Sequence, residues 1–181
     1  MPGTNHSSAT AHELTVRIAD PVLDNEQLYA LFRDARATDF ASLDWDAQRL
    51  DALLRGQFDA QRSDYDQRFP GSEQRLALLE GTPVALLWVW RSEDQIRLLD
   101  FIVAAARRNT GIGTALMLRL QAEAAEASVP LRHMVAVTNT RAIRLYERLG
   151  FMTIADAGSH LLMEYPPNAT GATGLRVPED G

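Results

Sequence analysis

The spacing of hydrophobic residues predicts one strand and two helices before Pro70. Residues 12–19 have the pattern of a strand. After Asp24, the expected N-cap, apolar residues recur along one helix face at Leu28, Leu31, Phe32 and Ala35. A second helix is predicted over residues 44–69, where the same spacing holds at Ala47, Leu50, Leu54, Phe58 and Tyr65. Pro70 and Gly71 end this helix.

The period of the pattern shortens after Gly71 and predicts a sheet. Three strands are expected over residues 74–79, 84–91 and 95–104, and the links between them are short enough for antiparallel hairpins. A helix then opens at Gly111, with its charged residues on one stripe, as expected for a helix packed on a sheet. The last elements predicted are a strand over residues 130–138, a short helix over 142–149, and a hairpin of 151–154 with 159–165.

Composition indicates one domain. A chain of 181 residues with 46% hydrophobic content can bury one sizeable core. Residues 1–10 and 166–181 are rich in Pro, Gly, Ser, Thr and Asn and lack apolar periodicity, so flexible tails are expected there. The sequence therefore predicts a single domain over residues 11–165.

Charge and residue types exclude several classes of function. The formal net charge of −6 argues against a nucleic-acid-binding surface and favours a cationic small molecule as a ligand. The absence of cysteine excludes disulfides, thiolate nucleophiles and Cys-based metal sites. The four histidines are scattered, so no metal site is predicted. The chain shows neither a signal peptide nor a membrane-spanning stretch, and we expect a cytoplasmic protein without membrane partners.

The stretch of residues 103–113 is the most informative part of the chain. A β-branched run ends there in basic residues and glycines that open a helix. Free backbone N–H groups at a helix start carry partial positive charge, so they can bind a diphosphate. Gly111 and Gly113 would let it approach, and Arg107 and Arg108 add full charge. Taken alone, the block also fits a glycine-rich turn without a ligand.

Two blocks carry a resemblance to a known family. Arg108-x-x-Gly111-x-Gly113 resembles the coenzyme A loop of the GNAT superfamily of acyl-CoA-dependent N-acyltransferases, whose pattern is Q/R-x-x-G-x-G/A. Residues 139–151 resemble its second signature, N-x-x-A-x-x-L-Y-E-x-x-G-F. Two ordered signatures argue against chance agreement, and the resemblance extends over residues 14–165. A dinucleotide fold fits less well, because Gly-Ile-Gly is followed by Thr114-Ala115-Leu116 and the third small residue of the dinucleotide-binding motif is lacking.

The resemblance implies a fold, a reaction and a set of binding residues. The fold is α+β, with a mixed, largely antiparallel sheet of six to seven strands flanked by about four helices. The reaction moves an acetyl group from acetyl-CoA to a primary amine of a small molecule or peptide, and a homodimer is common among relatives. The residues implied for the coenzyme are Ile102, Val103, Arg107, Arg108, Asn109, Thr110, Gly111, Ile112, Gly113, Thr114, Asn139 and Tyr146.

Two roles in the reaction are implied by position in these blocks. The backbone N–H near Val103 is the expected donor to the thioester carbonyl, although Ala105 stands where the family often has proline. Tyr146 corresponds to the family's general acid toward the departing sulfur, whereas an aromatic on a short amphipathic helix is by default a packing residue. Asn139 could cap its helix, bond the pantetheine amides, or do both.

The general base is less clear, because Met134 stands where some family members have glutamate. Asp100 is the best substitute, since a carboxylate within an apolar strand needs a partner or a task. The alternative is a structural acid paired with Arg97 or an N-terminal arginine. His133 and His160 are weaker candidates, because a lone histidine on a strand is more often packed or exposed.

The acceptor is not fixed by the sequence. Asp39, Asp44 and Asp46 lie beside Phe40 and Trp45 and could enclose an ammonium group, although such acids are more often caps and surface residues. Two alternatives stay open: an enzyme using another acyl group or an O-acceptor, and a non-catalytic acyl-CoA sensor. The missing glutamate at Met134 favours the sensor, and Tyr146 argues against it.

Overall fold

The computed structural model describes residues 13–40 and 45–167. The tail predicted at residues 1–10 and most of the one predicted at 166–181 lie outside the described residues. The elements in chain order are β1 (Leu14–Ile18), α1 (Asn25–Arg36), a 3-10 turn (Ala37–Phe40), α2 (Ala47–Arg68), β2 (Glu73–Leu79), β3 (Thr82–Arg91), β4 (Ile96–Val103), a 3-10 turn (Ala105–Arg107), α3 (Ile112–Glu126), β5 (Leu131–Ala136), α4 (Thr140–Arg148), β6 (Met152–Asp156) and β7 (His160–Tyr165).

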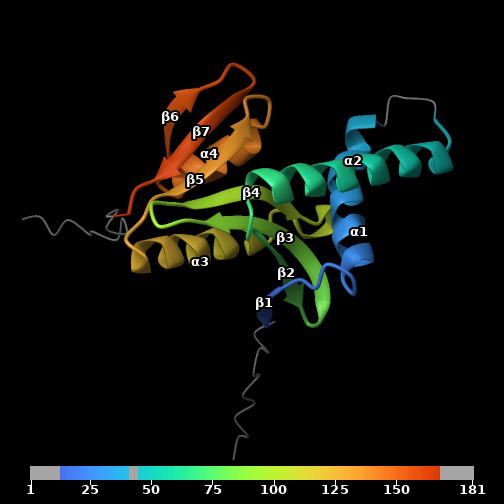
Figure 1. Ribbon diagram of the computed structural model, residues 1–181, viewed down its shortest axis with the longest axis horizontal. Coiled ribbons are helices and arrows are strands. Elements are labelled where there is room, and N and C mark those ends of the chain that lie inside the picture. The colour runs from blue at the N-terminus through green and yellow to red at the C-terminus, as the bar shows by residue number, and fades with distance from the viewer. Residues whose placement is uncertain (1–12, 41–44, 168–181) are drawn as a thin grey trace, which may run out of the picture.

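The strands form one seven-stranded sheet in the order β1-β2-β3-β4-β5-β7-β6. All neighbouring pairs are antiparallel except β4 and β5, which are parallel. Figure 1 shows α2 crossing in front of this sheet, with α3 on the opposite side. The predicted α+β fold with a largely antiparallel sheet and four helices is confirmed.

Helices bury an apolar core on each face of the sheet. On one face, α3 packs Leu116, Met117 and Leu120 against β3 and β4. On the other, α1 and α2 pack Phe32 and Phe58 against the sheet. Full burial of one such side chain is worth about 1.5–3 kcal/mol. These two layers hold the middle strands rigid, which matters because β4 leads into the predicted loop.

A β-bulge interrupts β4. Trp88 is opposite Asp100 while Val89 is opposite Leu98, so Leu99 is the extra residue. A bulge shifts the alternation of side chains along a strand. As a result Asp100 lies on the face covered by α2, where it accepts a hydrogen bond from Gln61.

The parallel pair separates soon after it begins. Three positions pair, Ile96 with Leu131, Arg97 with Arg132 and Leu98 with His133. Beyond Leu98, β4 and β5 run on without pairing to each other. The gap between their carboxyl ends is a wedge that opens toward the start of α3.

Asp24 stands at the start of α1, as predicted, but it does not cap the helix with its side chain. Its carboxylate accepts two hydrogen bonds from Arg17, at 2.5 and 2.7 Å, and one from the N–H of Asp20. These bonds, Arg17 first, lower the pKa of Asp24 to about 2. Asp24 therefore occupies the N-cap position, but its side chain does not bond to the helix, because Arg17 on β1 binds the carboxylate instead.

Candidate active site

A cleft of about 1080 Å³ occupies the wedge. It is walled by the separated ends of β4 and β5, the start of α3, α4, and the ends of α1 and α2. Most of the residues predicted for the site line this cleft: Asp100, Ile102, Val103, Arg107, Arg108, Asn109, Gly111, Gly113, Thr114, Asn139 and Tyr146. A smaller hollow of about 310 Å³ lies between β1 and α3 and contains none of them.

Thr110 and Ile112 are not among the residues that line the cleft. The Thr110 hydroxyl donates to the Arg107 carbonyl at 2.7 Å and so holds the turn. The Ile112 side chain is buried in the core beneath α3. Neither side chain faces the cleft, so only their backbone groups could serve a ligand.

The loop before α3 has two positions with positive φ, which glycine and asparagine tolerate better than other residue types. Gly111 has φ of 87° and Asn109 has φ of 65°, both in the left-handed region that glycine and asparagine adopt most readily. The first helical hydrogen bond runs from Ala115 N–H to the Gly111 carbonyl. The N–H groups of the residues between them, in the first turn of α3, have no acceptor within the helix. This turn can therefore bind an anion.

The N–H of Val103 points into the wedge. Hydrogen bonding alternates along an antiparallel strand, and the neighbouring Ala104 N–H donates to Val84 on β3 at 2.9 Å. The Val103 N–H therefore faces away from β3, toward β5, where pairing has already ended. The Val103 carbonyl accepts a hydrogen bond from Arg108 Nε at 3.1 Å, so Arg108 links the end of β4 to the loop.

Arginines dominate the charge at the loop end of the cleft. Five arginines line the cleft: Arg107, Arg108, Arg141, Arg144 and Arg148. Arg141 Nη2 donates to Asn109 Oδ1 at 2.6 Å and so ties α4 to the loop. The cleft is thus cationic at this end, although the chain as a whole is acidic.

Tyr146 lies on α4 with its side chain 3% exposed. Its ring packs against the rings of His133, at a centroid distance of 5.1 Å, and Phe151, at 5.5 Å. Burial, followed by the charge of Asp100, raises the pKa of its hydroxyl. Its hydroxyl makes no hydrogen bond to any described residue, so the proton is available to a group in the cleft.

Asp100 lies on the other side of the wedge. Its carboxylate accepts from Phe101 N–H at 2.9 Å and from Gln61 Nε2 at 3.3 Å, with Arg36 Nη2 4.0 Å away. Burial raises its pKa, and Arg36 and the two hydrogen bonds only partly oppose this. Of the arginines considered as partners, it is therefore one from the N-terminal part of the chain, Arg36 of α1, that lies beside Asp100.

His133 lines the cleft and is buried, which agrees with the expectation that a lone histidine on a strand is packed or exposed. Its Nδ1 lies 2.8 Å from the Leu98 carbonyl, so the tautomer with a proton on Nδ1 fits. Burial, with a further contribution from the Arg97 charge, lowers its pKa to about 4 and keeps the ring neutral at pH 7. The contact with Tyr146 crosses from β5 to α4, and no local pattern in the sequence signals it.

The remaining candidates divide between the cleft and structural roles. Asn139 Oδ1 accepts from Ala142 N–H at 3.1 Å, so it caps α4 while also lining the cleft. Met134 and His160 line the cleft as well. Of the three acids considered for the acceptor, Asp39 lines the cleft, Asp46 caps α2 through Arg49 N–H, and Asp44 lies outside the described residues.

The described part of the chain holds neither a metal-binding cluster nor a membrane-spanning helix. Residues 13–40 and 45–167 contain no group of three or more His, Cys, Asp or Glu placed to hold a metal ion. Within the same residues, no helix combines the length and apolar character needed to cross a bilayer.

The chain is similar to a known family over most of its length. The model of the acetyltransferase (GNAT) family matches residues 26–151, which include the loop and α4. No curated protein matches the chain.

Several solved structures share the fold. The PaiA N-acetyltransferase of Thermoplasma acidophilum, solved in complex with coenzyme A, has a TM-score of 0.67 and 16% identity over 85% of this chain and 99% of its own. An acetyltransferase from Thermus thermophilus has a TM-score of 0.63 and 22% identity, over 86% of this chain and 99% of its own. The ribosomal-protein-S18-alanine N-acetyltransferase of Escherichia coli has a TM-score of 0.61 and 18% identity, over 92% and 99%.

Proposed function

This chain belongs to the acetyltransferase (GNAT) family, and on that basis we propose that it moves an acetyl group from acetyl-CoA to a primary amine by direct attack in a ternary complex. One observation carries the proposal: the separated ends of β4 and β5 leave a cleft lined by Val103, Asp100 and Tyr146. The Thermoplasma acidophilum structure, solved with coenzyme A, supports the same class of ligand here.

The loop end of the cleft fits the diphosphate of coenzyme A. The first turn of α3 offers N–H groups without helical acceptors, and Gly111 and Gly113 place no side chain over them. Arg107 and Arg141 line the cleft nearby and can neutralise phosphate charge. The pantetheine arm would then extend along the wedge toward Val103.

The Val103 N–H is suited to hold the thioester carbonyl. It points into the wedge and is fixed by the β3–β4 ladder, so it needs no rearrangement to donate to the carbonyl oxygen. A donor held in this way stabilises the negative charge that develops on the oxygen when a nucleophile attacks.

Asp100 and Tyr146 supply the two proton transfers. Asp100 accepts a proton from the acceptor ammonium, directly or through water, and the amine nitrogen then forms a bond to the carbonyl carbon. After the attack the nitrogen carries a further excess proton, which it releases to solvent. When the carbon–sulfur bond breaks, Tyr146 donates its hydroxyl proton to the departing thiolate, and solvent restores that proton. The raised pKa of each group suits its role, since Asp100 becomes a stronger base and Tyr146 stays protonated.

Thiol release from acetyl-CoA, measured with a panel of primary amines, tests this function. We expect amine-dependent release and an acetylated product detectable by mass spectrometry. The proposal fails if acetyl-CoA binds but no amine in a broad panel accelerates release, because a sensor binds without turnover. Preferential release with alcohol acceptors or with a longer acyl chain would favour the other alternative. A cytoplasmic location, a single domain over residues 11–165 and a homodimer stay predictions.

A further inference from the structure

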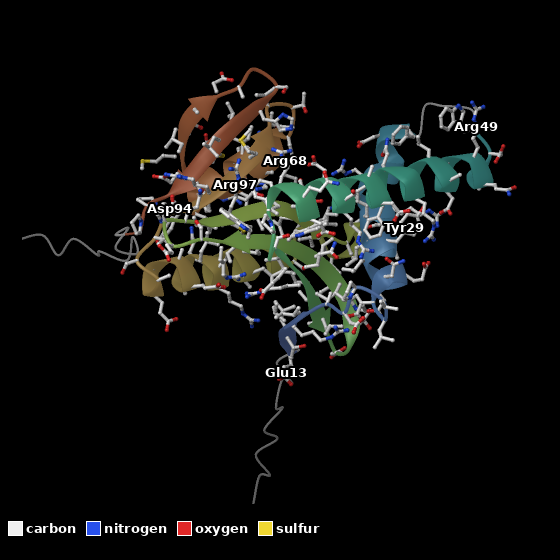
Figure 2. The ribbon with its side chains drawn as sticks, in the orientation of Figure 1. Glu13, Tyr29, Arg49, Arg68, Asp94 and Arg97 are labelled. Atoms are coloured by element: carbon white, nitrogen blue, oxygen red, sulfur yellow. The ribbon has the colours of Figure 1, made fainter. Side chains whose placement is uncertain are left out.

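Three arginines gather where the wedge closes. Arg97 of β4 is the Cα partner of Arg132 on β5, in the middle of the three pairs that form before the strands separate. Arg68, at the end of α2, is near enough to affect the titration of Arg97. Figure 2 labels Arg68 and Arg97 close together where α2 ends over β4.

Arg97 alone of these three lacks an acidic partner. Arg68 pairs with Asp64 at 3.0 Å and Arg132 with Glu164 at 2.7 Å. The Arg97 guanidinium forms no ion pair or hydrogen bond with any described residue, and it lies over the Phe69 ring, 5.4 Å from the ring centroid.

The surroundings make an unpaired charge at Arg97 costly. Burial lowers its pKa most, and the charges of Arg68 and Arg132 lower it further. A half-buried cation beside like charges is stabilised only when an anion compensates it. The guanidinium groups of Arg97 and Arg68 both lie over the Phe69 ring, which accounts for their position beside each other, but the N–H groups of Arg97 are left without an acceptor among the described residues.

This cationic cluster adjoins the acceptor end of the cleft. Arg132 and the cleft residue Met134 are two positions apart on β5, so they share a face of the sheet. Arg97 contacts the residue that ends α2 and Asp100 contacts Gln61 within α2, so both also lie on that face. The lining of the cleft reaches Tyr65, Leu99 and Met134 on this face, and Arg97 lies beyond that lining, so a molecule whose amine lies at Asp100 can extend along the face toward Arg97.

We propose that the acceptor carries, besides its amine, an anionic group, a carboxylate or a phosphate, that Arg97 binds while the amine lies at Asp100. This inference rests on the proposed function and names its substrate class. Three residues of strand separate the two positions, or about 10 Å at 3.3 Å per residue, so several bonds separate the amine from the anion. This arrangement disfavours an acceptor that carries only positive charge, such as a polyamine.

Calorimetric titration of three amines of similar length onto the protein with coenzyme A tests the inference. The probes are ω-aminohexanoate, ω-aminohexyl phosphate and hexylamine. We expect at least one anionic amine to bind about tenfold more tightly than hexylamine, the scale of one charged hydrogen bond. The tighter of the two anionic probes identifies the group as carboxylate or phosphate. Equal affinities, or no binding of either anionic amine, would overturn the inference.

Variants at Arg97 assign the effect. Arg97→Gln should remove the preference for the anionic amine and leave hexylamine affinity unchanged, while Arg97→Lys should keep part of it. Arg49→Gln is the matched control, since Arg49 stacks on Trp45 at the opposite end of α2 (Figure 2). A preference that survives Arg97→Gln in a folded protein would contradict the inference. Failure of the proposed function would show separately, either as no acetyl-CoA binding or as acetyl-CoA binding without amine-dependent thiol release.

Discussion

Tyr146 is the residue whose environment most favours a general acid. Burial between His133 and Phe151 raises the pKa of its hydroxyl, so the proton stays on at neutral pH. A thiol of unperturbed pKa about 8.5 is a fair leaving group, which limits how much an acid can contribute. We expect Tyr146→Phe, which keeps the ring, to lower kcat about tenfold to a hundredfold.

The control for Tyr146→Phe is coenzyme affinity. The Kd for acetyl-CoA should change by less than about threefold, because the loop and its arginines are untouched. Steady-state thiol release and calorimetry measure the two quantities. Unchanged turnover in the variant would remove Tyr146 from the mechanism.

Asp100 sets the expected dependence of activity on pH. Burial raises its pKa, so a larger fraction of the carboxylate is protonated and inactive as a base in mildly acidic solution. We expect kcat/KM to rise with pH through this raised pKa, above the ordinary value of an aspartate. Asp100→Asn should lower kcat/KM about a hundredfold and abolish that rise. If the variant kept the same pH profile, another group would be the base.

The lowered pKa of His133 predicts that the free energy of unfolding changes with pH. Its pKa is about 4 in the folded protein against an ordinary value of 6.5, so above pH 6.5 the folded and unfolded chains both hold it neutral and its contribution is complete. Between pH 6.5 and 4 the unfolded chain takes up a proton that the folded protein does not, so stability falls, by up to roughly 3 kcal/mol.

Urea unfolding at pH 7 and pH 5 measures this effect. His133→Gln, which retains a donor for the Leu98 carbonyl, should flatten the loss between these two values. An equally steep loss in wild type and variant would assign it to other groups.

At the scale of elements, the start of α3 combines helix initiation with ligand access. A Cβ at Gly113 would meet Val103 Cγ2 at 3.7 Å and Leu145 Cδ2 at 3.9 Å, which are ordinary contacts. Gly113→Ala should therefore fold and gain about 0.5–1 kcal/mol, the usual difference between Ala and Gly in a helix. The coenzyme A loop pattern accepts Ala as well as Gly at this position, so acetyl-CoA affinity should change by less than about threefold.

Thermal unfolding and calorimetry on Gly113→Ala check both parts of this prediction. A variant that loses stability, or that binds acetyl-CoA more than about tenfold more weakly than wild type, would contradict this account of the turn. Gly111→Ala is the contrasting variant: its φ of 87° strains any other residue, so it should lose stability instead.

The helices, strands and loop could be predicted because their signals are local. The spacing around Leu54 and Phe58, and the glycines before α3, fix helix faces and a helix start without reference to the rest of the chain. The bulge at Leu99 could not be predicted in this way, since it depends on the register of β4 against Trp88 and Val89 on another strand.

The residues that line the cleft could likewise be predicted where they fall within one continuous segment. Gly111, Gly113 and Tyr146 belong to continuous motifs and line the cleft as expected. Arg36 beside Asp100 and His133 beside Tyr146 are contacts between distant segments, so no spacing in the sequence signals them. At Asp24 the local signal predicted a side-chain cap, but the carboxylate binds Arg17, a residue of β1, instead.

At the scale of the whole molecule, overall charge does not determine the charge along the cleft. The net charge of −6 suggested a cationic partner. Folding instead brings arginines from the loop and α4 to one end of the cleft, and Arg97 and its neighbours to the other. Both ends therefore favour anionic groups, which fits a coenzyme diphosphate at one and the proposed acceptor anion at the other.

Titration of the purified full-length chain with acetyl-CoA tests the central claim most directly, with NADH as a control for nonspecific diphosphate binding. The account predicts one saturable site for acetyl-CoA and at least about tenfold weaker binding of NADH, since the pantetheine arm alone reaches Val103 along the wedge. Absence of acetyl-CoA binding at millimolar concentration, or equal affinity for both ligands, would contradict it.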